Sequence, residues 1–251
     1  ATMEPVFPCR INKYLAHTGV CSRREADELI AAGRVLIDGR PAALGSQVTA
    51  GQEVEVLGST ASKSYLAYYK GRGVITHSPA PHEVDIVTKL NADYGLTGLF
   101  PVGRLDKDSE GLMLLTNDGR ITGPLLDPAA NHEKEYDVMV DKPINNRFLQ
   151  ALEAGVTIEG YTTKPAVATA HPRNKQRFTL ILTEGKKHQI RRMCAALGYQ
   201  VQQLKRTRIM HITLGKLKPN QYRKLSPAER TQLLHTLGIS SSHPSPSNTS
   251  K

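Results

Sequence analysis

Tryptophan is absent from this 251-residue sequence, and cysteine occurs three times. Cys9, Cys21 and Cys194 are odd in number and widely spaced, and no CxxC or Cys/His cluster accompanies them. Neither a disulfide framework nor a zinc site is predicted, and Cys194 is expected to be a buried apolar residue. No apolar run approaches the ~20 residues that span a bilayer, and the start, ATMEPVFPCR, lacks the pattern of a secretory signal. These absences favour a soluble cytoplasmic protein that does not engage a membrane.

Charge is unevenly distributed along the chain. Lysine and arginine total 33 against 23 acidic residues, which gives a net charge of +10 and a pI near 9.6. A second basic stretch, Lys216–Lys224, follows a first one, Gly185–Arg208, that contains no acidic residue. The basic residues of the first stretch are Lys186, Lys187, Arg191, Arg192, Lys205, Arg206 and Arg208. A solvated protein face normally mixes both signs, so this clustering favours a nucleic-acid partner.

The segment Arg10–Leu57 has the pattern of a compact unit. In INKYLAHTG the apolar residues recur at helical spacing, and Ser22 followed by Glu25 predicts a capping box at the start of a second helix, EADELIAAG. Asp38-Gly39 in RVLIDGRPA is typical of a hairpin turn, and QEVEVL alternates like a strand. The predicted order is helix, helix, hairpin, strand.

The rest of the chain predicts a larger α+β domain. YLAYYKG, LMLLTNDG, KEYDVMV, FTLILTEG and VQQLKRTRI are strand-like, whereas RITGPLLDP, NNRFLQALEAG and HQIRRMCAALG are helical. Strands mixed with a few helices, without regular βαβ alternation, indicate a mixed, largely antiparallel sheet flanked by helices. We divide the chain into a small N-terminal domain (1–58), a polar linker (59–64), a larger domain (65–237) and a Ser/Pro-rich tail (238–251) that is expected to be disordered.

Three carboxylates alternate in GRLDKDSEGLMLL, at Asp106, Asp108 and Glu110. A calcium-binding EF-hand loop needs a bidentate glutamate at its twelfth position and a helix after it, whereas Asn117 stands there and LMLLT is strand-like. A phosphatase-type Asp-x-Asp pair needs an apolar strand before its first aspartate, whereas here the strand follows the acids. No metal is predicted. On the residues alone, the run is either a turn closed by its Asp and Ser side chains or the carrier of a catalytic acid.

The full pattern G-R-L-D-x-x-S-x-G-L resembles the active-site motif of pseudouridine synthases, specifically the family that modifies bacterial ribosomal RNA and carries an N-terminal S4 RNA-binding domain. Lys134 and Tyr136 in EKEYDV match a second family motif, and TEGKKHQIRRM matches a third. An earlier strand usually reads Asn-Lys-Pro; here Lys70 matches, while Tyr69 and Gly71 depart. RINKYLAHTGVCSRREADELIAAGRVLIDGR is similar to the S4 domain itself. Within this family, the chain looks most like the type that modifies large-subunit ribosomal RNA, on the segments HEKEY, DKPI, QIRRMC and RTRIM.

The resemblance implies an enzyme that isomerises a uridine in ribosomal RNA to pseudouridine without a cofactor. Asp106 is then the catalytic carboxylate, acting either as a nucleophile at C1′ or as a base at C2′ of the ribose. Arg191 is expected to pair with it and keep it ionised. Tyr136 is expected to stack on the flipped uracil, although on spacing alone it is a core aromatic beside Val138 and Val140.

Further residues are expected to contact the RNA. Arg104 would fill the space that the flipped base leaves, and Arg192 would contact the RNA backbone. Ile190 would pack beneath the base or hold Arg191. The other residues assigned to RNA binding are Lys70, Lys134, His188, Arg10, Lys13, Arg23, Arg24, Arg34, Lys205, Arg206 and Arg208.

The expected partner is a structured stem-loop of large-subunit ribosomal RNA, because target choice in this kind of enzyme rests on RNA shape and unpaired bases. A tRNA is a second candidate substrate, and the expected state is a monomer. The rival interpretation is a non-catalytic S4-type RNA-binding or ribosome-assembly protein. Such a protein would not need Arg104, Asp106, Tyr136 and Arg191 together.

Overall fold

The structure is a computed structural model that describes residues 7–18, 20–57, 63–77 and 81–239. The chain forms two compact units. The small unit comprises Ala1–Ser62, Asp118–Pro124 and Leu225–Lys251, and the large unit comprises Lys63–Asn117 and Leu125–Lys224. Most of the predicted linker (59–64) and of the predicted disordered tail (238–251) lies outside the described residues, so both remain predictions. None of the described helices is long and apolar enough to cross a membrane.

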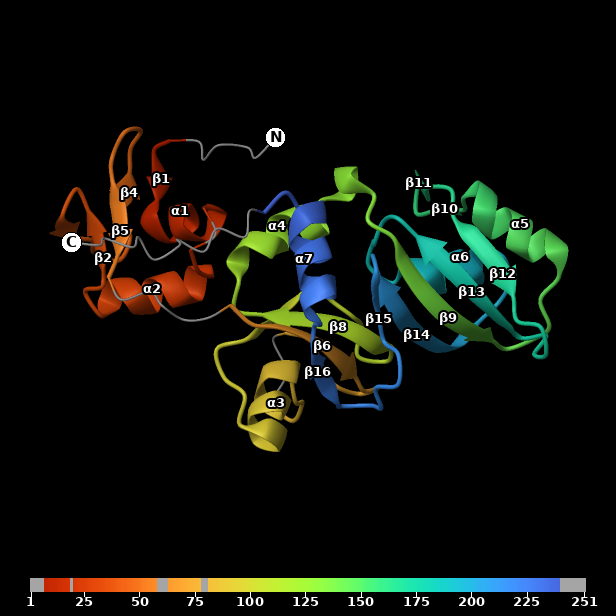
Figure 1. The fold of residues 1–251 in the computed structure, drawn as a ribbon. Coiled ribbons are helices and arrows are strands. Elements are labelled where there is room, and N and C mark those ends of the chain that lie inside the picture. Colours follow the sequence, from red (N-terminus) through yellow and green to blue (C-terminus); the bar gives the residue numbers. More distant parts are fainter. Residues whose placement is uncertain (1–6, 19, 58–62, 78–80, 240–251) are drawn as a thin grey trace. The chain divides into compact units, whose positions relative to one another are not determined.

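The small unit begins with the predicted helix pair and hairpin (Figure 1). Ser22 Oγ accepts a hydrogen bond from Glu25 N, and Glu25 Oε2 accepts one from Ser22 N, which confirms the capping box. Asp38 and Gly39 both have positive φ, 50° and 73°, as a two-residue primed turn requires. The elements are α1 (Ile11–His17), α2 (Arg23–Ala31), β1 (Cys9–Arg10), β2 (Val35–Ile37), β3 (Arg40–Pro41), β4 (Gln47–Val48) and β5 (Val54–Val56).

Two later segments also belong to the small unit. The 3-10 turn η1 (Gly119–Ile121) leads into α4 (Thr122–Leu126), whose last two residues already belong to the large unit, and α7 (Pro227–Thr236) follows residue 225. A second capping box, between Ser226 and Glu229, starts α7. The sequence pattern does not predict α7, because its apolar residues form no one-sided stripe.

The large unit is built on a nine-stranded sheet in which only β8 and β14 pair in parallel. The strand order is β12-β13-β9-β14-β8-β6-β16, with β15 beside β14 and β7 beside β8. This topology confirms the predicted α+β class and the largely antiparallel sheet. The strands are β6 (Tyr65–Lys70), β7 (Phe100–Val102), β8 (Glu110–Thr116), β9 (Lys134–Val140), β12 (Val167–Ala170), β13 (Arg177–Leu182), β14 (Val201–Ile209), β15 (Ile212–Thr213) and β16 (Tyr222–Lys224).

Helices cover each half of this sheet. α5 (Asn146–Ala154) and α6 (Gln189–Ala196) pack on β9, β13 and β14 and enclose a core around Phe148 and Phe178 (Figure 1). Cys194 of α6 is fully buried in this core, as predicted. α3 (Ile86–Tyr94) packs on β6 and β8. The short elements β10 (Thr157–Ile158), β11 (Tyr161–Thr162) and η2 (Pro128–Ala130) complete the unit.

The two halves of the sheet meet where β8 and β14 run in parallel. Gly111 of β8 has φ +114°, and a Cβ added there would lie 2.2 Å from the carbonyl oxygen of Arg206 and 2.6 Å from its nitrogen. Only glycine permits this close approach of the two backbones. The junction therefore fixes the start of β8, and with it the loop that carries Asp106, against β14.

Candidate active site

A cavity of about 520 Å³ lies within the large unit. Its walls come from four parts of the chain: the β7–β8 loop, the end of α4 with the segment after it, the β13–α6 connection with the start of α6, and strands β9 and β14. The predicted site residues that line it are Arg104, Asp106, Lys134, Tyr136, His188, Ile190 and Arg206. The structure thus brings the three predicted motifs to one place.

Asp106 stands in a loop that is held on both sides. Thr76 Oγ1 donates to the carbonyl of Leu105 at 2.8 Å and accepts from its N–H at 3.2 Å. Ser109 N–H donates to the carbonyl of Asp106 at 3.0 Å, which closes the turn. Leu105 is buried, so the loop backbone is anchored while the Asp106 side chain, 38 % exposed, remains open to the cavity. The turn and the catalytic-acid interpretations of this run are therefore compatible.

The three carboxylates of the run have separate surroundings. Asp106 lines the cavity, Asp108 is exposed, and Glu110 Oε2 accepts a hydrogen bond from Tyr69 Oη at 2.7 Å. Over the described ranges, no group of three His, Cys, Asp or Glu side chains is placed to hold a metal ion. Tyr69, one of the two departures from the family pattern, thus has a structural partner. The other departure, Gly71, lies so close to Asn220 that an added Cβ would be 2.7 Å from its Oδ1.

The side chain that contacts the Asp106 carboxylate is that of His188, and the predicted ion pair with Arg191 is wrong. His188 Nε2 lies 3.4 Å from Asp106 Oδ1. His188 precedes α6 with a left-handed backbone (φ 53°). Arg191, one turn into α6, instead donates from Nη2 to the carbonyl of Asp108 at 3.3 Å and to Ser109 Oγ at 3.2 Å. Arg191 therefore holds the loop behind Asp106.

Lys70 was assigned to RNA binding, and this assignment is also wrong. Its side chain is fully buried, and its ammonium donates to the carbonyls of Ser109 (2.8 Å), Gly71 (3.1 Å) and Lys107 (3.4 Å). Burial lowers the pKa of Lys70 to about 8, and the nearby carboxylates, Asp106 first among them, oppose the shift. Lys70 is a structural cation that holds the Asp106 loop from the β6 side.

Tyr136 and Ile190 belong to the hydrophobic core and also line the cavity. Tyr136 is 8 % exposed and Ile190 is 4 % exposed, and both belong to the core shared with Val138 and Val140. Both also line the cavity, so each presents one edge of the core to whatever fills it. Neighbouring Lys134 lies on the same wall, where burial and the Arg206 guanidinium lower its pKa.

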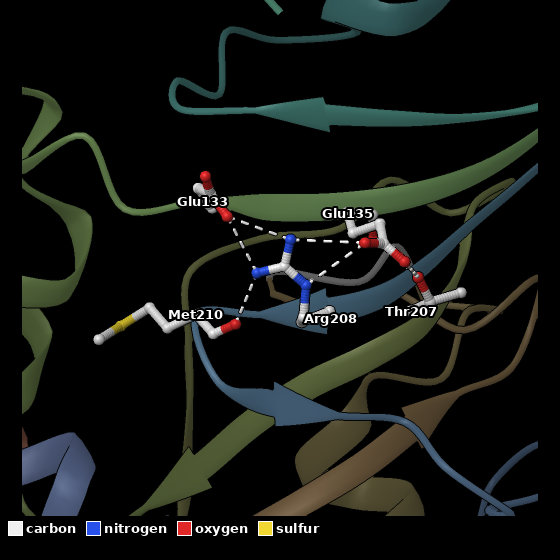
Figure 2. A network of polar contacts seen from close by, with 5 residues as sticks. All are labelled: Glu133, Glu135, Thr207, Arg208 and Met210. Carbon is white, nitrogen blue, oxygen red and sulfur yellow. Dashed lines mark hydrogen bonds and ion pairs between the residues drawn. The ribbon is translucent and has the colours of Figure 1, made fainter. Parts of the chain in front are cut away.

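Several cations of the Gly185–Arg208 stretch are neutralised by acids from elsewhere in the chain. Arg208 contacts Glu133, Glu135 and the carbonyl of Met210, as Figure 2 shows. Arg192 lies 3.1 Å from Glu159. Pairing of β9 with β14 brings Glu133 and Glu135 beside a stretch that has no acid of its own, and Glu159 comes from the turn between β10 and β11. A single-sign run along the chain therefore does not give a single-sign surface here.

Two more of the predicted cations have local partners. Lys205 Nζ lies 4.0 Å from Asp137. Arg206 is 4 % exposed, and its guanidinium donates to the carbonyls of Leu112 at 2.8 Å and Arg104 at 3.4 Å. Arg206 thus supports both the start of β8 and the residue two positions before Asp106. By contrast, Arg104 and Lys187 are exposed at the cavity.

The basic residues predicted in the small unit are mostly exposed. Arg10 and Lys13 lie at the start of α1, and Arg23 and Arg24 lie at the start of α2. Arg34 is half-buried and donates from Nε to the carbonyl of Leu57 at 2.9 Å. Arg34 thus links the start of β2 to the end of β5. The side chains of the other four residues are exposed to solvent.

Residues that the sequence did not single out also shape the site. Thr76 anchors Leu105 from a stretch, GVITHS, that carries no recognisable signal. Glu184 lines the cavity although it is almost fully buried. The one signal for Glu184 in the sequence was its position in TEGKKHQIRRM, where an acidic residue precedes several basic ones.

Comparison with known proteins agrees with this geometry. Residues 64–196 match the family model described as RNA pseudouridylate synthase, and residues 9–54 match that of the S4 domain. The fold and the site thus define an RNA-modifying enzyme with an S4 domain. The chain belongs to the RNA pseudouridylate synthase family, as the sequence motifs predicted. It is an RNA pseudouridine synthase, an isomerase.

Three similar proteins illustrate the match. The dual-specificity RNA pseudouridine synthase RluF of Salmonella typhi is 40 % identical over 94 % of this chain and 82 % of its own length. The ribosomal large subunit pseudouridine synthase B of Bacillus subtilis (strain 168) is 35 % identical over 89 % and 95 %. A crystal structure of a pseudouridylate synthase covers 89 % of this chain and 99 % of its own, with 29 % identity and a TM-score of 0.67.

Proposed function

We propose that this enzyme converts a uridine in a structured stem-loop of large-subunit ribosomal RNA into pseudouridine, and that Asp106 is the catalytic group. One observation carries the proposal: the Asp106 carboxylate, Tyr136 and exposed cations line the same cavity. Its volume of about 520 Å³ falls in the ~300–1,000 Å³ range of sites for small molecules. A single everted nucleotide therefore fits, whereas a duplex does not.

The reaction is an isomerisation in which atoms balance without a co-reactant. The N1–C1′ bond breaks, the base turns, C5 bonds to C1′, and the C5 proton leaves while N1 gains one. Asp106 serves either as the nucleophile at C1′ or as the base at C2′. His188 Nε2 lies 3.4 Å from the carboxylate that either route uses.

The nucleotide reaches Asp106 only after eversion, which costs a few kcal/mol of stacking. Tyr136 would recover ~1–3 kcal/mol of this by stacking on the uracil. Arg104, exposed at the cavity, would take the vacated place in the RNA. Lys187 at the cavity, and Arg10, Lys13, Arg23 and Arg24 in the small unit, would contact phosphates.

The choice of RNA is supported by the names of the relatives and by the S4 domain. One relative is named for the large ribosomal subunit and another for dual specificity, so a tRNA is proposed as a second substrate. Action as a monomer in the cytoplasm completes the proposal. The non-catalytic alternative is abandoned, because the chain belongs to an enzyme family.

The test is to map pseudouridines in ribosomal RNA and tRNA by carbodiimide modification and primer extension. Cells that lack the protein should lose a large-subunit pseudouridine. Wild-type protein should restore it, and Asp106→Asn should not. Identical maps with and without the protein would contradict the proposal. A tRNA position that responds in the same way would establish the second substrate, and light scattering of the purified protein would test the monomer.

A further inference from the structure

Glu184 is a buried carboxylate that the reaction above does not use. It follows β13, lines the cavity and is 6 % exposed. Its oxygens accept hydrogen bonds from Tyr161 Oη, from Lys164 N–H at 2.8 Å and from Gln189 Nε2 at 2.7 Å. Desolvation raises the pKa of Glu184, but these hydrogen bonds outweigh it and leave the pKa below its ordinary value. The carboxylate is therefore ionised at neutral pH.

Glu184 is part of a closed circuit of side chains. Gln189 Oε1 accepts from Lys186 N–H at 2.9 Å, and the Lys186 ammonium lies 4.1 Å from the centre of the Tyr161 ring. Tyr161 returns the circuit to Glu184 through its hydroxyl. We call Tyr161, Glu184, Lys186 and Gln189 the Glu184 cluster. It ties the β10–β11 hairpin to the connection between β13 and α6.

That connection and the first turn of α6 supply one contact each to the loop of Asp106. His188, one residue before α6, lies 3.4 Å from the Asp106 carboxylate. Arg191, in the first turn of α6, donates to Ser109 Oγ at 3.2 Å. Gln189 stands between these two residues, so the hydrogen bond from Gln189 to Glu184 fixes the backbone from which both contacts depart.

The charge of Glu184 is unfavourable for RNA binding. It adds a negative group to a cavity that also presents Lys134, Lys186 and Lys187, and a phosphate would be repelled by it. Its place there is explained by geometry, since an ionised carboxylate is a stronger acceptor than any neutral side chain.

We propose that Glu184 is a positioning residue for the isomerisation: it holds the β13–α6 connection so that His188 and Arg191 keep Asp106 in its reactive place. This inference rests on the proposed function, because it concerns the same site. It predicts that Glu184 affects the rate of the chemical step and not the affinity for RNA.

The decisive variant is Glu184→Gln. The amide keeps the shape but removes the negative charge, so the hydrogen bonds from Lys164 N–H and Gln189 Nε2 lose their charge assistance, and the one from Tyr161 Oη must reverse its direction. We expect single-turnover pseudouridine formation to fall by about 10–100-fold, as for a displacement of ~1 Å at a reactive centre. The Kd for the RNA should stay the same or fall by up to about threefold, because no phosphate contact is lost and a charge that repels phosphate is removed. Tyr161→Phe removes one hydrogen bond and should lose less.

Glu153→Gln is the matched control. Glu153 Oε1 also accepts a backbone hydrogen bond, from Ala168 N–H at 3.2 Å, but Glu153 lies on α5 and is not among the described residues that line the cavity. Its rate and Kd should equal those of the wild type. A Glu184→Gln protein with the wild-type rate would overturn the inference. So would one in which the Kd rises as much as the rate falls.

A spectroscopic measurement separates this inference from the proposed function. The ring signals of His188 can be assigned in NMR spectra from their loss in His188→Gln. They should shift in Glu184→Gln and stay in place in Glu153→Gln. Unchanged His188 signals in Glu184→Gln would overturn the inference whatever the wild-type activity. A wild-type protein without product on any RNA would instead contradict the proposed function, while the NMR result still decides the role of Glu184.

Discussion

His188 and Asp106 lie side by side in the lining of the cavity, and His188 Nε2 is 3.4 Å from Asp106 Oδ1. The contact depends on a left-handed backbone at His188 (φ 53°), which turns the chain just before α6 begins. Arg191 was expected in this position, but a helix directs it one turn further, to Asp108 and Ser109. The carboxylate thus has an imidazole beside it and a guanidinium behind its loop.

Asp106→Asn should abolish pseudouridine formation, by at least about three orders of magnitude, because the amide is neither nucleophile nor base. The Asp106 side chain is 38 % exposed, so the fold should be little affected. RNA should bind with a Kd within about threefold of the wild type, because phosphate contacts set the affinity. Release of tritium from C5-labelled uridine measures the reaction directly. Residual release above a few per cent would exclude Asp106 as the catalytic group.

Lys70 should make the stability of the protein depend on pH. Its pKa is about 8 in the folded state against 10.5 as the ordinary value, so between these values the unfolded state binds more protons and stability rises with pH. Below pH 8 the buried ammonium is charged in both states and its cost is fully present. We expect the wild type to gain about 2 kcal/mol relative to Lys70→Met between pH 7 and pH 9.5.

Urea unfolding of both proteins at the two pH values measures this difference, and groups that titrate in both proteins cancel. Lys70→Met should also be less active at pH 7, because the carbonyls of Ser109, Gly71 and Lys107 lose their shared donor. A stability difference that does not change with pH would show that Lys70 keeps its ordinary pKa.

Gly111→Ala should unfold the sheet junction. The added Cβ would lie 2.2 Å from the Arg206 carbonyl oxygen at a φ of +114°, and backbone cannot yield as a flexible side chain does. We expect a loss of more than about 3 kcal/mol. Gly160→Ala is the control: its φ is +77° and nothing lies within 4 Å of an added Cβ, so about 1 kcal/mol should be lost. Equal losses in thermal or urea unfolding would contradict the close approach.

Salt dependence of RNA binding should separate paired from exposed cations. Arg208 is held by Glu133 and Glu135, so Arg208→Gln should leave the slope of log K against log[salt] nearly unchanged. Lys187 is exposed at the cavity, and Lys187→Gln should reduce the slope by about 0.7–0.9. Filter-binding titrations over a range of salt concentrations measure both. A larger change for Arg208 than for Lys187 would mean that the Arg208 pairs open when RNA binds.

Local patterns predicted the elements with strong signals. The Ser22 capping box, the Asp38-Gly39 turn and the apolar stripe of α6 are each encoded within a few neighbouring residues, and each was correctly predicted. Asp106 was predicted as the catalytic group from a motif of similar length, and this role stays a prediction. What failed was the partner of each charge, because Lys70 and Arg208 are paired by residues that strand pairing brings from elsewhere. A sequence shows which charged residues are present, but the register of strand pairing determines which of them are in contact.

Parallel pairing of β8 with β14 has a consequence for the newly made protein. Asp106 is translated well before Arg206, yet the wall that supports Asp106 closes only when these two strands meet. The N-terminal part of a chain emerges from the ribosome and folds first. A chain that is still being synthesised therefore lacks a complete cavity. The site around Asp106 is therefore completed only after β14 has left the exit tunnel of the ribosome.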